Sequence, residues 1–506
     1  MSPPNLSSSL LSSRISTGWT LTVIVWIAYF LRTNQLAGQS LWRDEVDAIR
    51  FSDWPVEDLV TGLIQKGHNG PLFFLLLRFW RNMFGDTEFA LRYISVLMGT
   101  LAVPVGFVLA RQLGLSRRAG LLLALLLATS PYLVWYGQEA KMYAFLLLTV
   151  TLAFVAYLKA LDGLGLRWWL VFVVATTLSF YLHILSPLML LVYVVVALLR
   201  YGDLRRHWKA WLSSMACLTL PYIPLAVWQF SFLAEGTDRG HPFYPLRQEF
   251  YVLLQLYTSG LLSFVGLTAI ILFVFLFLAG LFLHNRRARF EKLTSAKRLI
   301  LATWALLPPL VVYLISLRVP VFEDRYLIYI SPAFYLIVVL GLLLVRQHST
   351  KLAALALGLI LAINLLGIWQ QQRQPLKADF RAAGAYLSNY PSRPATIMVQ
   401  MPYLRHTLNY YYDHNYDFVE GLWTNGGNSE DSVGQEMSQR TAGLTNLWLV
   451  VSEEDTWDSR HLVRAWLDDH ATLVDRANFM RVDVYHYELR PGSIEPQNSK
   501  ALLEPH

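Results

Sequence analysis

The sequence is poor in cysteine and in charge. Cys217 is the only cysteine in 506 residues, which excludes an intramolecular disulfide and a metal site built from several cysteines. Charged residues make up 15% of the chain and hydrophobic residues 55%, whereas soluble domains average about 25% and about 45–50%. This composition excludes an ordinary soluble protein and is typical of an integral membrane protein.

The sequence also lacks the patterns that accompany nucleic-acid binding. The net charge is +7, but residues 1–370 hold 30 Lys and Arg against 17 Asp and Glu, while residues 371–506 hold 12 against 18. The excess positive charge lies in short loops between apolar runs, where such charge orients membrane helices. We therefore expect contact with membrane lipids and no nucleic-acid partner.

Apolar runs recur through the first 370 residues. A transmembrane helix needs about 20 mostly apolar residues, and no run of that length follows residue 371. The sequence predicts about eleven spans. They are 17–34, 91–111, 119–136, 142–161, 167–182, 186–200, 209–232, 262–283, 299–317, 326–345 and 352–370.

The loops between these spans differ in charge. With the N-terminus in the cytoplasm, the cytoplasmic loops hold 17 basic and three acidic residues, and the outer loops hold 10 and 14. Basic residues favour the cytoplasmic side. We assign residues 71–84 to the membrane interface, because a span there would turn the basic loops outward. We expect a multi-pass plasma (inner) membrane protein with a cytoplasmic N-terminus and an extracytoplasmic C-terminal domain.

Two domains follow from this pattern. Residues 1–370 form a predicted transmembrane catalytic domain, which includes the first outer loop at 35–90. In residues 371–506 short helical and strand patterns alternate, which is typical of a small α/β domain. Within it we expect residues 421–434, which are polar, to form a loop.

Polar side chains gather at the outer ends of the predicted spans. Ionisable groups at membrane depth cost about 2.5–3.5 kcal/mol each on insertion scales, so they usually pair with one another or mark function. Taken singly, each has a structural alternative, such as an acid at a helix start, a local ion pair or an aromatic anchor. Their position on one side of the membrane indicates a site. The segments are Leu41-Trp42-Arg43-Asp44-Glu45, His68-Asn69-Gly70-Pro71-Leu72, Tyr136-Gly137-Gln138-Glu139-Ala140-Lys141-Met142-Tyr143, Tyr181-Leu182-His183 and Glu323-Asp324-Arg325-Tyr326.

This ordered set resembles the bacterial relatives of the protein O-mannosyltransferases and of the lipid A aminoarabinose transferase. These are GT-C fold, glycosyltransferase family 39-like enzymes that use a lipid-phosphate sugar. The family shows Trp-x-Asp-Glu in its first outer loop, followed by a His-x-Pro-Leu-type element and by an Arg at the second span, here Arg92. Gln-Glu-Ala-Arg-x-Tyr and a late Arg-Tyr pair complete the pattern. The resemblance covers about residues 40–370.

The resemblance implies a polytopic α-helical GT-C membrane protein and roles for individual residues. Asp44 would be the base of a single-displacement, inverting reaction, with Glu45 supporting it. Arg325 and Lys141 would bind the donor phosphate, and Arg92 and His183 are the next candidates for this role. His68 would orient Asp44 or the acceptor. The other substrate-binding residues would be Gln138, Glu139, Tyr143 and Tyr326.

The implied partners are a polyprenyl-phosphate sugar donor and a lipid, glycan or protein acceptor. No cofactor is required by this reaction, and the sequence leaves open a divalent cation held by acids such as Asp44 and Glu139. Lys141 departs from the family pattern, because it replaces the two-pronged Arg guanidinium with a point charge.

Two other classes of function remain as alternatives. A lipid-linked glycan flippase or transporter would carry polar residues along mid-span paths, whereas here they lie at the outer ends of spans. An O-antigen ligase or polymerase-like enzyme would place its key Arg and His in a large late outer loop. A structural or receptor role would leave the ordered motifs unexplained.

Overall fold

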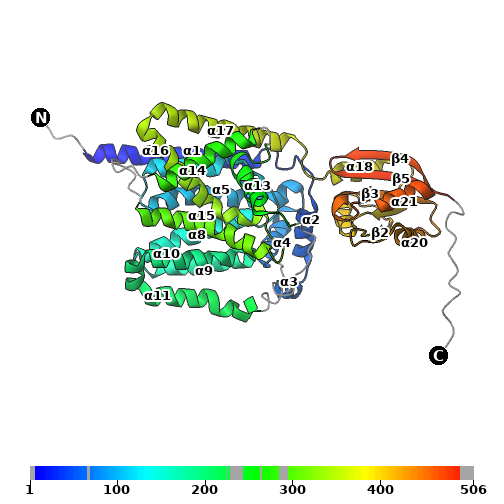
Figure 1. The fold of residues 1–506 in the computed structure, drawn as a ribbon, viewed down its shortest axis with the longest axis horizontal. Coiled ribbons are helices and arrows are strands. Elements are labelled where there is room, and N and C mark those ends of the chain that lie inside the picture. The colour runs from blue at the N-terminus through cyan, green and yellow to red at the C-terminus, as the bar shows by residue number, and fades with distance from the viewer. Residues whose placement is uncertain are drawn as a thin grey trace. The chain divides into compact units, whose positions relative to one another are not determined.

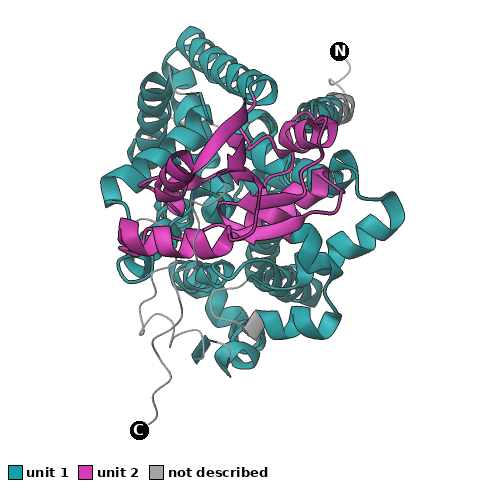
Figure 2. Ribbon diagram, turned by 90° about the vertical axis from the view of Figure 1, so that its right-hand side faces the viewer, with its two compact units in different colours: residues 1–36, 48–374 teal, residues 37–47, 375–506 magenta. Residues whose placement is uncertain are grey.

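The computed structural model describes residues 6–64, 69–224, 226–227, 243–262, 265–283 and 294–490 (Figure 1). The chain forms two compact units (Figure 2). Unit 1 comprises residues 1–36 and 48–374, and unit 2 comprises residues 37–47 and 375–506. The predicted domain boundary at residue 370 lies close to the one at residue 374. Residues 37–47 differ from the prediction, since they belong to unit 2 rather than to the transmembrane domain.

Unit 1 is helical. Its first half contains α1 (Leu6–Thr33), α2 (Arg43–Asp53, which begins in unit 2), α3 (Val56–Ile64), α4 (Leu72–Phe84), α5 (Glu88–Gln112), α6 (Arg117–Thr129), α7 (Pro131–Gly137), α8 (Tyr143–Leu161) and α9 (Leu166–Leu182). The second half contains η1 (Ser186–Leu188), α10 (Met189–Leu199), α11 (Tyr201–Thr219), η2 (Leu220–Tyr222), α13 (Leu246–Ser259), α14 (Gly266–Phe282), α15 (Ser295–Ser316), η3 (Asp324–Ile330), α16 (Ser331–His348) and α17 (Thr350–Arg373).

Several of these helices are long and apolar enough to cross a membrane. Within the described ranges they are α5, α8, α15, α17 and the continuous segment Asp324–His348, with the bent pair α6 and α7 as a sixth candidate. The apolar helices Leu166–Leu182, Ser186–Leu199 and Gly266–Phe282 are shorter. The expected span at 209–232 runs into residues outside the described ones. The count of eleven spans therefore stays a prediction.

A buried arginine explains how the chain tolerates the 57° bend between α6 and α7. Ser130 and Pro131 interrupt the helix, and Pro131 cannot donate a backbone hydrogen bond. The Arg32 guanidinium, which is fully buried, donates instead to the carbonyl oxygens of Leu127 and Ala128 at 3.0 and 3.1 Å. Carbonyl groups freed at a break in an apolar environment need such partners. The carbonyl groups freed at the break thus have a hydrogen-bond donor within unit 1.

Unit 2 is built on a five-stranded sheet. Its strands are β1 (Thr396–Val399), β2 (Asp417–Glu420), β3 (Asn446–Val451), β4 (Ala471–Phe479) and β5 (Val482–Leu489), in the order β2-β1-β3-β5-β4. β1 pairs in parallel with β2 and β3, and β5 pairs antiparallel with β3 and β4. Its helices are α18 (Phe380–Asn389), η4 (Pro402–Leu404), α19 (Arg405–Tyr411), α20 (Glu430–Arg440), η5 (Glu454–Thr456) and α21 (Leu462–His470).

Alternation along β3 places apolar side chains on both faces of this sheet. Leu447 and Leu449 pack in the core that α20 and α21 complete, while Trp448 and Val450 pack in the core with α18 and α19. Successive side chains of a strand point to opposite faces, so a wholly apolar strand requires cover on both. The expectation of a loop at 421–434 was wrong in its last part, because α20 begins at Glu430.

Candidate active site

The Trp42-Arg43-Asp44-Glu45 motif lies at the start of α2. Asp44 and Glu45 occupy its first turn, where the helix dipole favours negative charge. Glu45 is fully buried, and its Oε2 lies 3.0 Å from Nζ of Lys377, whose side chain is 8% exposed. Lys377 follows the last transmembrane candidate by only a few residues, and no sequence motif predicts that it pairs with Glu45. Glu45 is thus held as one half of a buried ion pair.

Asp44 is the more accessible of the two acids. Its side chain is 18% exposed, and Nε of Arg43 lies 3.5 Å from its Oδ1. Nη1 of Arg43 donates in turn to Oε2 of Glu453 at 2.7 Å. Burial lowers the pKa of the Arg43 guanidinium, but the carboxylates of Glu453 and Asp44 outweigh it and leave the pKa raised. A permanent cation therefore stands beside the carboxylate of Asp44.

In unit 1 the turn between α7 and α8 carries the second motif. Lys141 is 9% exposed, and among the described residues its ammonium makes neither a hydrogen bond nor an ion pair. The backbone carbonyl of Lys141 accepts from the hydroxyl of Ser95 at 3.2 Å, which fixes the turn. Glu139 is buried in the same turn, and the ring of Tyr143 contacts that of Tyr136 at 5.3 Å. Lys141 is a cation suited to an anionic ligand.

Two residues of the predicted substrate set have structural partners. Gln138 donates to the backbone carbonyl oxygens of Arg32 and Asn34, at 3.0 and 2.8 Å. Arg92 is 2% exposed and donates to the carbonyl oxygen of Leu36 at 2.9 Å. Both side chains thus hold the chain that leaves α1.

His183 lies in the turn between α9 and η1. It is fully buried, and the backbone N–H of Leu185 donates to its Nδ1 at 3.2 Å, so the proton of the neutral ring lies on Nε2. Burial, and then the charge of Arg325, lower the pKa of His183 to about 3. Nε2 has no hydrogen-bond partner among the described residues. His183 therefore presents a neutral N–H donor at neutral pH.

The segment from Glu323 to η3 supplies the last motif. The His183 and Tyr326 rings are 4.7 Å apart, and Nε of Arg325 lies 3.8 Å from Oε2 of Glu323. The hydroxyl of Tyr136 donates to Oδ2 of Asp324 at 2.7 Å, which connects this segment to α7. The structure thus brings His183, Arg325 and Tyr326 together.

A further acid belongs to the same neighbourhood. Burial, and then the charges of Glu323 and Asp324, raise the pKa of Glu249 on α13 to about 7. The sequence analysis named Asp324 within the segment Glu323-Asp324-Arg325-Tyr326, but it missed Glu249 as a member of this cluster. Glu249 has no motif around it that would have signalled its place here.

His68 lies outside the described residues, but the residues that follow it are placed. Oδ1 of Asn69 accepts from the backbone N–H of Ile184 at 3.2 Å. A Cβ at Gly70 would collide with the backbone of Tyr181, so only glycine allows this approach. The loop that follows His68 therefore packs against the turn of His183.

The predicted residues divide between the two units. Asp44 and Glu45 belong to unit 2, and Arg92, Gln138, Glu139, Lys141, Tyr143, His183, Arg325 and Tyr326 belong to unit 1. In the described part of the chain no group of three or more His, Cys, Asp and Glu side chains has the arrangement of a metal site.

Comparison with known proteins agrees with this architecture. Residues 68–228 match the family model described as dolichyl-phosphate-mannose-protein mannosyltransferase. No curated protein sequence matches the chain significantly. The crystal structure of ArnT from Cupriavidus metallidurans in the apo state is similar, with 18% identity, a TM-score of 0.55 and coverage of 93% of this chain and 98% of that chain.

Two further structures share this similarity. ArnT from the same organism bound to undecaprenyl phosphate has 16% identity, a TM-score of 0.51 and coverage of 93% and 98%. The arabinofuranosyltransferase AftD from Mycobacteria has 14% identity and a TM-score of 0.51, with coverage of 93% of this chain and 40% of that chain. The chain therefore has the GT-C fold expected from its motifs, and its residues 68–228 match the protein mannosyltransferase family.

Proposed function

We propose that the protein is an inverting glycosyltransferase that moves a sugar from a polyprenyl-phosphate donor to an envelope glycolipid, polysaccharide or protein acceptor. The observation that carries this proposal is a set of hydrogen-bond donors without acceptors in unit 1. Among the described residues neither the Lys141 ammonium nor Nε2 of His183 has a partner. Leaving a buried donor such as the His183 N–H unpaired is costly, and an ammonium without a counter-ion attracts negative charge, so both groups favour an anionic ligand.

The fold supports a lipid phosphate as that anion. One of the similar structures, ArnT, holds undecaprenyl phosphate, which supports a lipid phosphate as the donor group here. A lipid donor needs a protein embedded in the bilayer, and the apolar helices of unit 1 meet this requirement. In the proposed complex Lys141 and Arg325 neutralise the phosphate, and the His183 N–H donates to one of its oxygens. Arg92 supports this group through the chain after α1.

The proposed reaction is a single displacement. The acceptor hydroxyl oxygen attacks the anomeric carbon of the sugar, and its proton passes to the carboxylate of Asp44. The bond from that carbon to the phosphate oxygen breaks, and its electron pair leaves with the polyprenyl phosphate. Glu45, held by Lys377, supports Asp44 by fixing the first turn of α2. Gln138, Glu139, Tyr143 and Tyr326 shape the sugar pocket, and His68 orients the acceptor.

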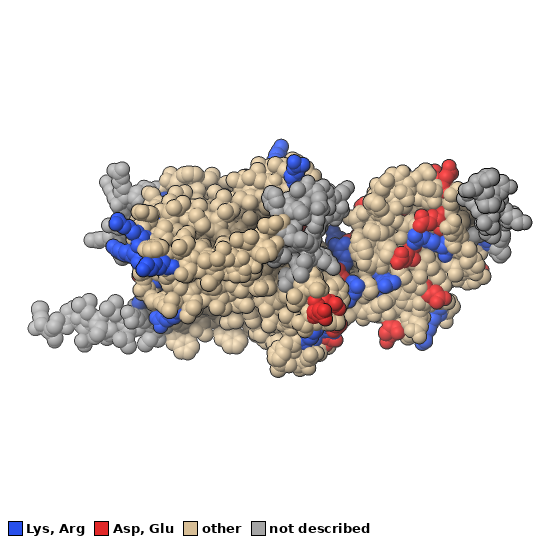
Figure 3. Space-filling view, turned by 90° about the horizontal axis from the view of Figure 1, so that it is seen from below, with Lys and Arg blue, Asp and Glu red and all other residues tan. Residues whose placement is uncertain are grey.

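The proposed arrangement in the membrane follows the loop charges. On the face drawn in Figure 3, Lys and Arg gather at the left-hand end of unit 1, and no Asp or Glu appears there. We assign this end to the cytoplasm by the positive-inside rule. The protein would then cross the inner membrane about eleven times, with a cytoplasmic N-terminus. Residues 371–506 would form an extracytoplasmic α/β domain.

The donor class is tested with purified protein in liposomes. Radiolabelled polyprenyl-phosphate hexoses and pentoses are supplied with extracted envelope lipids, polysaccharides and proteins as acceptors. We expect label to move into one acceptor fraction while free polyprenyl phosphate accumulates in equal amount. Transfer from nucleotide sugars in the absence of any lipid-linked sugar would contradict the proposal, and movement of intact donor across the bilayer without transfer would favour a flippase.

A further inference from the structure

The segment that carries Asp44 is bonded to unit 2 along its whole length. Four hydrogen bonds precede the motif. The Gln39 side-chain oxygen accepts from the N–H groups of Leu376 and Lys377, both at 3.0 Å. The Ser40 hydroxyl donates to the carbonyl oxygen of Ala378 at 2.8 Å, and the N–H of Leu41 donates to the Tyr411 hydroxyl at 2.6 Å. The segment is thus anchored to the body of the C-terminal unit before α2 begins.

The residues directly before and after Asp44 each form an ion pair. Arg43 pairs with Glu453 at 2.7 Å on one side, and Glu45 pairs with Lys377 at 3.0 Å on the other. The side chains of Arg43 and Glu453 are 24% and 31% exposed, while Glu45 and Lys377 are almost completely buried. Since both neighbours of Asp44 are held by residues of unit 2, the backbone that carries its carboxylate is restrained.

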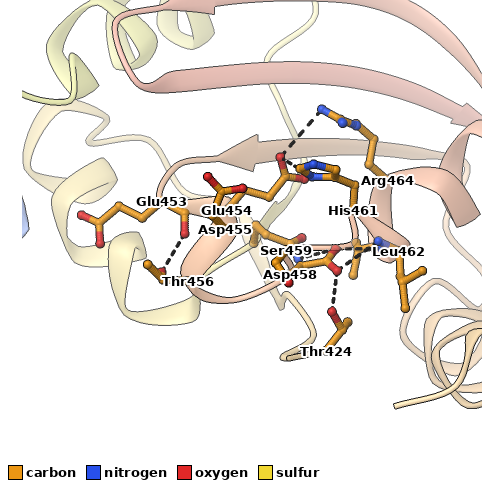
Figure 4. A network of polar contacts seen from close by, with 12 residues as sticks. Thr424, Glu453, Glu454, Asp455, Thr456, Asp458, Ser459, His461, Leu462 and Arg464 are labelled. Carbon is orange, nitrogen blue, oxygen red and sulfur yellow. Dashed lines mark hydrogen bonds and ion pairs between the residues drawn. The ribbon is translucent and has the colours of Figure 1, made fainter. Parts of the chain in front are cut away.

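The turn that carries Glu453 is itself highly organised (Figure 4). Glu453 has a φ of 54°, in the left-handed region that non-glycine residues seldom adopt. Its carbonyl oxygen accepts from the Thr456 hydroxyl at 2.7 Å. Asp458, which is fully buried, accepts from the backbone N–H groups of Leu462 and Val463, both at 3.0 Å. Uncommon backbone conformations persist where surrounding bonds impose them, and they concentrate at functional positions.

From these contacts we propose that Glu453 and Lys377 are positioning residues for Asp44. Glu453 and Lys377 act on Asp44 through Arg43 and Glu45, so residues of the C-terminal unit hold the proposed base in place. The inference rests on the proposed function. It gives the C-terminal unit a role in the rate of transfer, separate from recognition of the acceptor.

The test is the Glu453→Ala variant of the full chain, with Asp455→Ala as the matched control. Asp455 lies in the same turn, and its side chain is exposed. We expect Glu453→Ala to lower kcat at least tenfold, with KM for donor and acceptor changed less than twofold. Glu453→Gln, which still offers Arg43 an oxygen, should lose less. In Arg43→Ala the further change of Glu453 to Ala should have no added effect.

A second measurement does not depend on activity. We expect Glu453→Ala to speed amide hydrogen exchange over residues 42–47, while exchange in β3 is unchanged. Full kcat in Glu453→Ala, or a loss expressed in acceptor KM, would overturn the positioning role. A wild-type protein that transfers no sugar would remove the proposed function. In that case unchanged exchange over 42–47 would overturn the positioning role, and faster exchange would support it.

A second, independent observation is a cavity in unit 1 of about 400 Å³ between α6, α16 and α17. Its walls are formed by five leucines and two alanines, which include Leu121, Leu342 and Leu357. Arg118 and Arg346 also line it. Both arginines are exposed, and neither has an ion-pair partner in the part of the chain that the structure describes. The cavity therefore combines apolar walls with uncompensated positive charge.

We infer that this cavity binds an anionic phospholipid of the surrounding bilayer. The phosphate would pair with Arg118 and Arg346, because guanidinium groups bind phosphate through two parallel hydrogen bonds. The acyl chains would lie along the leucines, which a soluble phosphate could not use. A zwitterionic lipid carries an ammonium that opposes the same arginines, so we expect a preference for lipids with net negative charge.

The test is native mass spectrometry of the full protein after exchange into vesicles of phosphatidylcholine with and without phosphatidylglycerol. We expect wild type to retain phosphatidylglycerol, and Arg118→Gln with Arg346→Gln to bind it at least tenfold more weakly. The matched control is Arg205→Gln with Arg206→Gln, two exposed arginines on α11 away from the cavity. Equal retention by the cavity variant and wild type, or equal retention of both lipids by wild type, would overturn this inference.

Discussion

Removal of the Lys377 ammonium is expected to destabilise unit 2 strongly. At 3.0 Å the attraction between Lys377 and Glu45 is about 5.5 kcal/mol with an effective dielectric constant of about 20. The Glu45 side chain has no solvent exposure, so Lys377→Met leaves a carboxylate buried without this counter-charge. Breaking a buried pair by removing one partner costs about 3–5 kcal/mol. We expect a loss of that size in the free energy of unfolding.

The measurement is denaturant unfolding of the purified protein in detergent, followed by amide hydrogen exchange in β3. The control is Arg393→Met, an exposed cation in the same unit, for which we expect a change below about 0.5 kcal/mol. Lys377→Met with Glu45→Gln should recover most of the lost stability, because the buried carboxylate is removed together with its counter-charge. A loss in Lys377→Met no larger than in Arg393→Met would refute the reasoning, and so would a double variant that recovers nothing.

Three further predictions concern unit 1. Lys141→Ala is expected to lower kcat/KM about 100-fold or more, as the removal of a charge-stabilising donor does elsewhere, while Lys141→Arg keeps most of the activity; steady-state kinetics decide this. Burial lowers the pKa of His183 from 6.5 to about 3, so the stability of the wild type should decline as the pH falls from 6.5 toward 3. In thermal unfolding scans His183→Gln should remove this part of the decline. An identical decline in both proteins would contradict the prediction. A Cβ at Gly280 would collide with the carbonyl of Ile337 on α16, so Gly280→Ala should lower Tm by several degrees, while Gly358→Ala, which has open space, should leave it unchanged.

The fold of unit 1 could be predicted in outline because apolar runs of membrane length have few alternatives. The expected span at 142–161 nearly coincides with α8, and Asp324–His348 contains the one expected at 326–345. The number of spans could not be fixed in this way. Leu166–Leu182 and Gly266–Phe282 are apolar but short, and hydropathy alone does not separate a short span from a buried helix.

The polar architecture was harder to predict, because it depends on contacts between distant parts of the sequence. Lys377 and Glu45 are 332 positions apart, and neither has a neighbour that signals the other. Arg32 lies in the last turn of α1, a position typical of an arginine that anchors a helix at the membrane interface. It is nevertheless fully buried at the bend between α6 and α7. Helix α20 escaped prediction because it is mostly polar, with only Val433 and Met437 buried.

The candidate site shows the same division. The motifs identified the turns that carry Lys141, His183 and Arg325, since the residue types and their order are visible in one dimension. They did not separate residues with open polar groups from those with structural partners, such as Gln138 and Arg92. That distinction requires the positions of backbone carbonyl groups, which the sequence does not encode locally.

The central claim is that Asp44 takes the proton from the acceptor during transfer from a lipid phosphate. The most direct measurement compares wild type, Asp44→Asn and Asp58→Asn in liposomes that contain radiolabelled polyprenyl-phosphate sugar and the identified acceptor. Asp58 is an exposed acid of the same loop and serves as the control. The account predicts transfer by wild type and Asp58→Asn, and a loss of about 1,000-fold in kcat for folded Asp44→Asn, within the range of about 100- to 10,000-fold that a general base contributes. Equal rates for Asp44→Asn and wild type would contradict it.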